Sequence, residues 1–241
     1  GDFEIYPLMD GYFRLDGGMM FRQAKIQWRN FYTPDGLGRI KLAARCYLIK
    51  GSVITLFDTG MGDSSDPMFG RIKDEAYKDF FSIDQSGGNL IKNMRFEGFA
   101  ERDVRFVTQS HLHLDHTGWH MYTDICLEKI KPTFPDASYL VHDFEWRAAK
   151  ERHPLSLKSY RPGAYEPLLL ADPIWRLKFL WKIKGLDVRG LRNDWFRVEP
   201  GLYLIRTGGH TRGHWSMLAD GGKEKAFFPG DLIPTSKHIS P

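Results

Sequence analysis

The alternation of apolar and polar residues predicts most of the strands of this chain. Residues 45–58, RCYLIKGSVITLFD, contain two runs rich in β-branched residues on either side of Lys50 and Gly51, which predicts a β-hairpin. Residues 3–18, FEIYPLMDGYFRLDGG, predict two short strands joined at MDG. Further strands are predicted at residues 103–110, 137–142, 201–210, 214–220 and 225–231.

Two segments between these strands have helical patterns. Residues 88–98, GNLIKNMRFEG, place Leu90, Ile91 and Met94 on one side of a helix. Residues 143–152, DFEWRAAKER, predict a helix that opens on Asp143 as its cap. Strands and helices in this order indicate an α/β layered fold, and a length of 241 residues suits one domain, 1–241.

Residues 175–184, WRLKFLWKIK, alternate apolar and basic residues at nearly every step. A helix would spread these apolar residues all round its surface, so we prefer a strand. The segment 173–183 could cover a site, pair with a second subunit or form a sheet edge, and its lysines favour a protected edge strand. Residues 150–172 are predicted to be irregular.

The composition argues against several classes of protein. With 42% hydrophobic and 27% charged residues the chain is ordinary globular protein, and no stretch approaches the roughly 20 apolar residues of a membrane span. The net charge of +4 includes no run of basic residues that would indicate nucleic acid. Cys46 and Cys126 are too few for a disulfide framework, and Cys46 is predicted to be a buried strand residue.

The candidate chemistry begins at SHLHLDHTG, directly after a predicted strand. Three of the nine histidines of the chain, His111, His113 and His116, stand there beside Asp115. Imidazole and carboxylate ligands together suit Zn²⁺, and also Fe or Mn. A lone HxH pattern is weak, but HxHxDH straight after a strand strongly indicates a metal site.

Two later stretches have the same character. TGGHTRGH supplies His210 and His214 at the end of a predicted strand. FFPGD places Asp231 at the end of another strand, where a carboxylate can bridge two metals. Each motif alone is explained by a glycine turn with a polar residue, but three of them at strand ends predict a metal centre.

HLHLDH, GGHTRGH and PGD resemble the motifs of the metallo-β-lactamase superfamily, and LFDTGMGD resembles its early aspartate motif. RLDGGMMF, PTFPDASYLVHDFEW and GDLIPTSKH are similar to the lactonase-like branch that includes N-acyl-homoserine lactone hydrolases. The similarity covers most of residues 3–241. It implies an αββα sandwich with the metals at one edge of the two sheets.

The resemblance implies two divalent metal ions, Zn²⁺ first and Fe, Mn or Co as alternatives. The first would be held by His111, His113 and His210, the second by Asp115 and His116, with Asp231 bridging them. Two close metals lower the pKa of a bridging water toward ~7, and the resulting hydroxide would attack the carbonyl of a lactone or ester. Asp115 is the candidate proton shuttle to the leaving group.

Other residues are expected outside the metal shell. By the resemblance, Asp58 would hold a ligand histidine by a hydrogen bond, and a solvated turn aspartate is the alternative. His214 would have a structural or supporting role. His120, His142 and His153 match no ligand position.

The sequence departs from the superfamily pattern near its end. One more histidine for the second metal is usual well after the bridging aspartate, but only ten residues follow Asp231. Among them, His238 matches a position outside the metal shell. We therefore expect a sandwich lacking its C-terminal segment, or a short form with a weakened second site. Pro234 stands where some lactonases carry a tyrosine that contacts the substrate carbonyl, which weakens a strict lactonase assignment.

The expected function is metal-dependent opening of an N-acyl-homoserine lactone, as in quorum quenching. The alternatives are an organophosphate or aryl-ester hydrolase, a glyoxalase-II-like thioesterase, a β-lactamase, a nuclease, or a non-catalytic ligand-binding form with an incomplete metal site. Met19, Met20, Phe21 and Trp119 are candidate apolar walls of a substrate pocket, although we prefer plain core packing for each.

The remaining expectations concern partners and location. We expect a small-molecule substrate, no nucleic acid and no membrane span, and a homodimer is common in families of this kind. The chain begins at Gly1 and shows no signal-peptide pattern, so a cytoplasmic location is the default expectation. A removed signal peptide would instead indicate a secreted or periplasmic protein.

Overall fold

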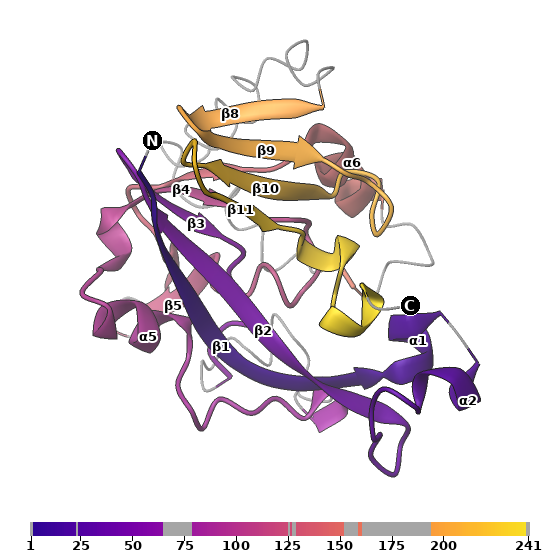
Figure 1. The fold of residues 1–241 in the computed structure, drawn as a ribbon. Helices are drawn as coiled ribbons and strands as arrows, with labels where there is room; N and C mark the ends of the chain where they lie inside the picture. The colour runs from indigo at the N-terminus through magenta and orange to yellow at the C-terminus, as the bar shows by residue number, and fades with distance from the viewer. Residues whose placement is uncertain are drawn as a thin grey trace.

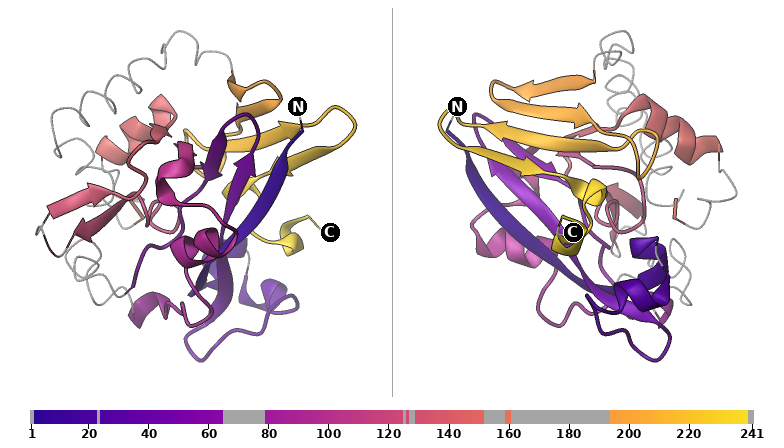
Figure 2. Two further views of the ribbon diagram at one scale, coloured as in Figure 1. Left: turned by 90° about the vertical axis from the view of Figure 1, so that its left-hand side faces the viewer. Right: turned by 45° about the vertical axis from the view of Figure 1, so that its right-hand side comes forward.

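The computed structural model describes residues 2–22, 24–64, 79–124, 126, 129–151, 159–160 and 194–239. Its two main sheets have the strand orders β1-β2-β3-β4-β7 and β11-β10-β9-β8. Figure 1 shows the second sheet in orange and yellow above the long β1–β2 ribbon, and Figure 2 gives two further views.

The first sheet consists of β1 (Glu4–Asp16), β2 (Arg39–Lys50), β3 (Ile54–Phe57), β4 (Val104–Thr108) and β7 (Ser138–Leu140). The second consists of β8 (Trp195–Glu199), β9 (Leu202–Arg206), β10 (Trp215–Asp220) and β11 (Lys225–Phe228). A separate hairpin joins β5 (Met121–Asp124) to β6 (Lys129–Pro132).

The predicted hairpin at residues 45–58 is confirmed. β2 and β3 pair antiparallel from Tyr47 with Phe57 to Lys50 with Ile54. β2 begins earlier than expected, at Arg39, and its exposed and buried residues alternate as far as Cys46, which is fully buried. This period of two is that of a strand with one face on a core.

The prediction of two strands joined at MDG is wrong. β1 is one strand of 13 residues that pairs with β2 along its whole length. The register shifts between Met9 and Gly11, where Gly11 has φ +120°. MDG is therefore a bulge, which places an extra residue in one strand without ending it.

Both predicted helices are present. α5 (Leu90–Phe96) has Asn89 as its cap, and α6 spans Asp143–Glu151. The expected cap of α6 is wrong: the N–H of Phe144 donates to Nδ1 of His142 over 3.1 Å. The Asp143 carboxylate instead pairs with Arg147 at 2.8 Å.

The strands predicted at 103–110, 137–142, 201–210, 214–220 and 225–231 correspond to β4, β7, β9, β10 and β11. β5, β6 and β8 were not predicted. The segments 175–184 and 173–183, most of 150–172, and His153 lie outside the described residues.

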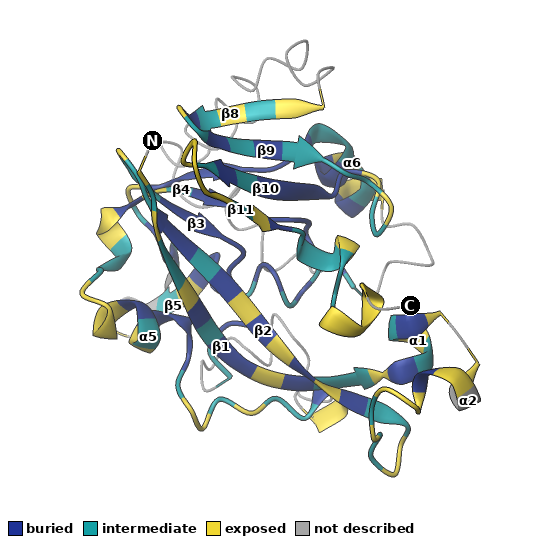
Figure 3. Ribbon diagram, viewed as in Figure 1, coloured by how far each residue is buried: buried dark blue, intermediate teal, exposed yellow. Residues whose placement is uncertain are grey.

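Apolar side chains fill the space between the two sheets. From the first sheet come Ile49, Phe57 and Leu140, and from the second Leu204 and Met217, all buried. The opposite face of the first sheet packs on α5 and α6 in a second apolar cluster. Figure 3 shows the buried positions of both sheets in dark blue. The order helices, sheet, sheet is a layered α/β architecture.

A third apolar cluster lies at the far end of the β1–β2 ribbon, where α1 (Gly17–Phe21) and α2 (Lys25–Trp28) pack. The described residues also form three short 3₁₀ turns, η1 (Glu101–Asp103), η3 (Gly230–Leu232) and η4 (Ser236–His238). No helix in the described ranges is long and apolar enough to cross a membrane.

Candidate metal centre

Loops at one end of both sheets bring the candidate residues together. β3, β4 and β7 are parallel, so their carboxyl ends meet at one edge of the first sheet. Asp58 follows β3 there, and the histidine motif follows β4. From the second sheet, β9 leads toward His210, and Asp231 follows β11. The first residue of β10 donates its N–H to the carbonyl of Ser110 over 2.9 Å, which joins the two sheets beside the site.

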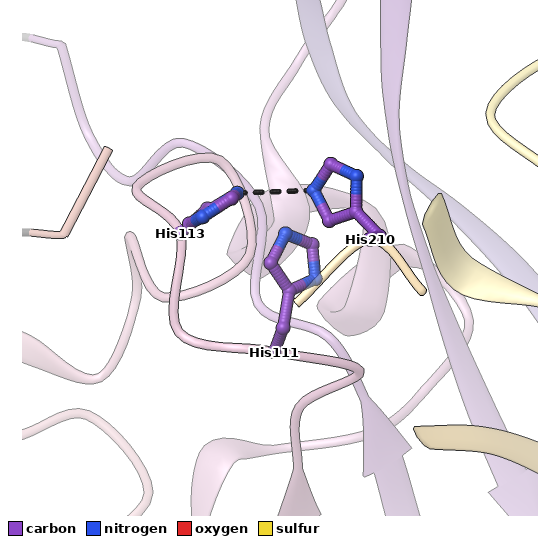
Figure 4. Close-up of side chains that lie close together, drawn as sticks. All are labelled: His111, His113 and His210. Atoms are coloured by element: carbon purple, nitrogen blue, oxygen red, sulfur yellow. Dashed lines mark hydrogen bonds between the residues drawn. The ribbon is translucent and has the colours of Figure 1, made fainter. Parts of the chain in front are cut away.

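The rings of His111, His113 and His210 point toward one another (Figure 4). The ring centroid of His111 lies 4.3 Å from that of His113 and 4.5 Å from that of His210. Nδ1 of His113 lies 3.1 Å from Nε2 of His210. One donor nitrogen of each ring lies within 4.8 Å of the others, so the three side chains could hold one metal ion.

A second group of side chains adjoins the first. His111, His116 and Asp231 offer donor atoms within 4.8 Å of one another. Oδ1 of Asp231 is 3.5 Å from Nε2 of His116, and Oδ2 is 3.4 Å from Nε2 of His210. Oδ2 of Asp115 also lies 3.5 Å from Nε2 of His116. The Asp231 carboxylate therefore faces histidines of both groups.

The chemistry of these donors fits divalent cations. His111 is 1% exposed, yet its Nε2 has no hydrogen-bond partner among the described residues, a rare condition for a buried polar atom. Burial lowers the pKa of His111 well below its ordinary value and that of His113 to about 3. Both rings are therefore neutral near pH 7 and present the lone pairs that a metal ion requires.

His116 has the opposite shift. Burial would lower its pKa, but the carboxylates of Asp58, Asp115 and Asp231 together raise the pKa of His116 well above its ordinary value. Three carboxylates around one imidazole favour positive charge at this point. A cation at Nε2 would take the place of the proton, so the same carboxylates would favour metal binding.

Asp58 holds the histidine loop by three contacts. It accepts from the N–H of Ser110 over 2.6 Å and from the Ser110 hydroxyl over 3.0 Å, and it lies 2.9 Å from Nδ1 of His116. Oγ of Ser110 also lies 3.0 Å from Nδ1 of His111. These contacts at Nδ1 leave Nε2 of both histidines facing the site. Ser110 is absent from the sequence-based predictions, although a hydroxyl residue directly before HxHxDH is the signal for it.

His214 lies behind the candidate ligands. It is fully buried, and its Nδ1 lies 2.7 Å from Oγ1 of Thr207. Its ring centroid is 5.4 Å from that of His111, and burial lowers the pKa of His214 to about 3. A Cβ on Gly230 would lie 2.9 Å from Nε2 of His214, so the glycine before Asp231 lets the chain pass close to this ring. His214 belongs to neither group of metal-capable side chains.

The candidate pocket residues fall into two places. Met20 and Phe21 lie in the cluster around α1, where Phe21 stacks on His238 at 4.5 Å and His238 Nε2 lies 3.2 Å from the carbonyl of Met20. Trp119 is 6% exposed in the core beside α5 and α6, and its indole donates to Asp10 over 2.6 Å. Trp119 thus packs as a core residue. Met19 is 64% exposed.

Residues 40–241 match the family model Lactamase_B, the metallo-beta-lactamase superfamily. A layered α/β fold with a cluster of histidines at one edge of its sheets is the architecture of a class of metallohydrolases. The chain belongs to the metallo-β-lactamase superfamily. The resemblance and the fold class inferred from the sequence are thereby confirmed.

Individual curated proteins and solved structures are also similar to the chain. The chain is 31% identical over 138 residues to the N-acyl homoserine lactonase AttM of Rhizobium radiobacter. The aligned residues make up 56% of this chain and 43% of that protein. It therefore spans about half the length of the curated relatives that it matches first. A probable metal-dependent hydrolase from Staphylococcus aureus has a TM-score of 0.78 at 21% identity over 99% of this chain and 76% of that one. The dizinc quorum-quenching lactonase AidC has a TM-score of 0.62 at 21% identity over 97% and 72%. These structures share the fold.

Proposed function

We propose that this protein is a hydrolase that uses two divalent metal ions, zinc first, to open a lactone or ester. An N-acyl-homoserine lactone is the first substrate to test, because curated relatives carry the name N-acyl homoserine lactonase. The observation that carries the proposal is the position of Asp231, whose two oxygens face His116 at 3.5 Å and His210 at 3.4 Å. A carboxylate between two groups of ligands suits a pair of metals.

His111, His113 and His210 would hold one cation, and His116 with Asp115 the other, with Asp231 between them. Divalent cations there would act as Lewis acids, making water acidic enough to attack at neutral pH and polarising the scissile carbonyl. The buried, neutral imidazoles keep the ligand atoms free of protons. Ser110 and Asp58 keep Nε2 of His111 and His116 directed into the site.

Asp115 is the proposed proton shuttle. Burial would raise its pKa, but the neighbouring His116 lowers the pKa of Asp115 below its ordinary value, so its side chain is a carboxylate near pH 7. As water attacks the carbonyl, this carboxylate accepts the proton from the attacking oxygen. When the bond to the ring oxygen breaks, it passes the proton to the departing alkoxide, and the product is a hydroxy acid.

In this proposal residues 1–241 form one metallo-β-lactamase-like domain, and the protein is a homodimer in the cytoplasm. Elemental analysis of protein purified without chelator, followed by assays with lactone, ester, thioester, β-lactam and phosphotriester substrates, tests this function. We expect two metals per chain and fastest turnover of a lactone.

His111→Ala should lower the metal content, whereas His238→Ala, at a histidine outside both groups, should leave it unchanged. Wild-type protein with one metal or none would refute the dinuclear mechanism. Two metals per chain with faster turnover of another substrate class would support the metal site and refute the lactone as the preferred substrate.

A further inference from the structure

We propose that Glu145 is a positioning residue that ties together the two histidine-bearing loops of the metal centre. Its carboxylate is fully buried and contacts both loops, although it touches none of the candidate ligand side chains directly. The inference rests on the proposed metal-binding function, and it gives a role to Glu145, which stands in the stretch PTFPDASYLVHDFEW but has no role assigned from the sequence.

One oxygen of Glu145 binds the first histidine loop. Oε1 accepts from the N–H of Leu112 over 3.0 Å, and Leu112 stands between His111 and His113. The same oxygen accepts from the hydroxyl of Tyr160 over 2.9 Å. The ring of Tyr160 lies edge-on against His113, with 5.0 Å between centroids. Glu145 thus fixes the backbone between two candidate ligands and the ring beside one of them.

The other oxygen binds the second loop. Oε2 accepts from the hydroxyl of Thr211 over 2.6 Å and from the N–H of Gly213 over 3.3 Å. Thr211 follows His210 directly. A Cβ on Gly213 would lie 2.2 Å from the backbone nitrogen of Glu145, so this loop runs directly against α6. The carboxylate therefore sets where His210 stands relative to His111 and His113.

The negative charge of Glu145 is accommodated without leaving the protein interior. The residue lies in the first turn of α6, where the helix dipole favours a carboxylate. Four N–H and O–H donors share the charge, and hydrogen bonds to a charged acceptor are stronger than those between neutral groups. A buried carboxylate satisfied on both oxygens is a rigid link, and rigid support of ligand loops governs the affinity for a metal.

Glu145→Gln tests this link because it keeps the shape of the side chain. One carboxylate oxygen becomes an NH₂ group, which cannot accept, so either the Leu112 side or the Thr211 side loses its acceptor. We expect metal to bind about 10- to 100-fold more weakly, as is usual when support of a ligand is removed. Thr211→Val removes a single contact and should weaken binding in the same direction by less, so the test survives if Glu145→Gln does not fold.

Glu199→Gln is the matched control. Glu199 is also buried, 8% exposed, and accepts from the N–H of Ser52 over 2.9 Å and from its hydroxyl. It pairs with Leu202, at the end of β9 away from His210. Both Ser52 donors bind Oε2, and Oε1 has no hydrogen-bond partner among the described residues, so glutamine can keep an oxygen at the Oε2 position. This variant removes a buried charge far from the histidine loops and should leave metal affinity unchanged.

The measurement is the dissociation constant for Zn²⁺, by competition with a chromogenic chelator, together with the visible spectrum of the Co²⁺-loaded protein and the urea stability of the metal-free protein. Weaker binding and an altered Co²⁺ spectrum in Glu145→Gln alone would support the inference. Binding within twofold of wild type, or equal weakening in Glu199→Gln, would overturn it. Wild-type protein that binds metal but hydrolyses no substrate would count only against the proposed function. Wild-type protein that binds no metal would count against both.

Discussion

His142 should make the stability of the metal-free protein depend on pH. Its ring is 3% exposed, packs edge-on against Trp215 at 5.0 Å between centroids, and accepts the N–H of Phe144 at the start of α6. Burial, and then the nearby Arg206, lower the pKa of His142 to about 4, against an ordinary value of 6.5. Protonation of Nδ1 would also remove the acceptor that caps the helix.

The sign and size of this pH effect follow from the numbers of protons bound by the unfolded and the folded state. The unfolded ring binds a proton below pH 6.5 and the folded ring only below about 4, so the unfolded state binds more protons in between. Stability from this group is complete above pH 6.5 and is lost as the pH falls toward 4. At 1.36 kcal/mol per pKa unit, the loss is about 2 kcal/mol at pH 5 relative to pH 8. The low exposure of the ring means that solvent screens this effect little.

His142→Asn isolates the contribution, because asparagine can still cap the helix but does not titrate. Urea unfolding of the chelator-treated wild type and variant at pH 8 and pH 5 measures the free energy of unfolding. The other buried histidines titrate in both proteins, so only the difference between the two pH dependences counts. Wild type should lose about 2 kcal/mol more than the variant. Parallel pH dependences would refute the reasoning.

Three further predictions concern buried contacts of the fold and of the site. Asp10→Asn should cost about 4 kcal/mol in urea unfolding, because each oxygen of Asp10 accepts from two buried N–H groups and either pair would lose its acceptor; a cost under about 1 kcal/mol would contradict this. Gly118→Ala should lower the free energy of unfolding by about 3 kcal/mol or more, since its Cβ would lie 1.9 Å from the carbonyl carbon of Met61. Gly87→Ala, whose Cβ would have nothing within 4 Å, should be nearly neutral in the same assay. Asp58→Asn, which tolerates the φ of 62° at this position, should weaken Zn²⁺ binding by about 10- to 100-fold in a chelator competition, and an unchanged dissociation constant would show that the contact with His116 is dispensable.

Local pattern was sufficient for the parts of the fold that depend on neighbouring residues. The β2–β3 hairpin, α5, α6 and three strands of the second sheet, β9, β10 and β11, follow from periodicity and glycine turns. The sequence predicts a turn at the bulge in β1, because MDG has the composition of a turn and only the continuous pairing with β2 keeps it in a strand. The sequence predicts the wrong cap for α6, because aspartate is a common cap and neutral histidine is not.

In the candidate site, too, residues in local motifs could be predicted from the sequence, and residues with distant partners could not. The histidines and Asp231 stand in short motifs at strand ends, so sequence alone named them. Glu145 and Asp10 are also buried and each accepts several hydrogen bonds, but their partners lie far away in the chain. Asp10, for example, accepts from an indole 109 residues further on. A single acidic residue in a helix or strand carries no local sign of such partners. The resemblance to known motifs named the candidate ligands and Asp58, but not Ser110 or Glu145, which also contact the histidine loops.

The distance along the chain between the two halves of the metal centre has a consequence for synthesis. His113 and His210 are 97 residues apart, and Asp231 comes later still. At about 5 to 20 residues per second, the ribosome needs roughly ten seconds after the HLHLDH loop emerges before Asp231 follows. During that interval the nascent chain carries three histidines and an aspartate in one short loop without their partners from the second sheet. Premature capture of a cation by this loop is therefore a hazard of biogenesis, and the order of events in the cell decides whether metal enters a finished site or an exposed half of one.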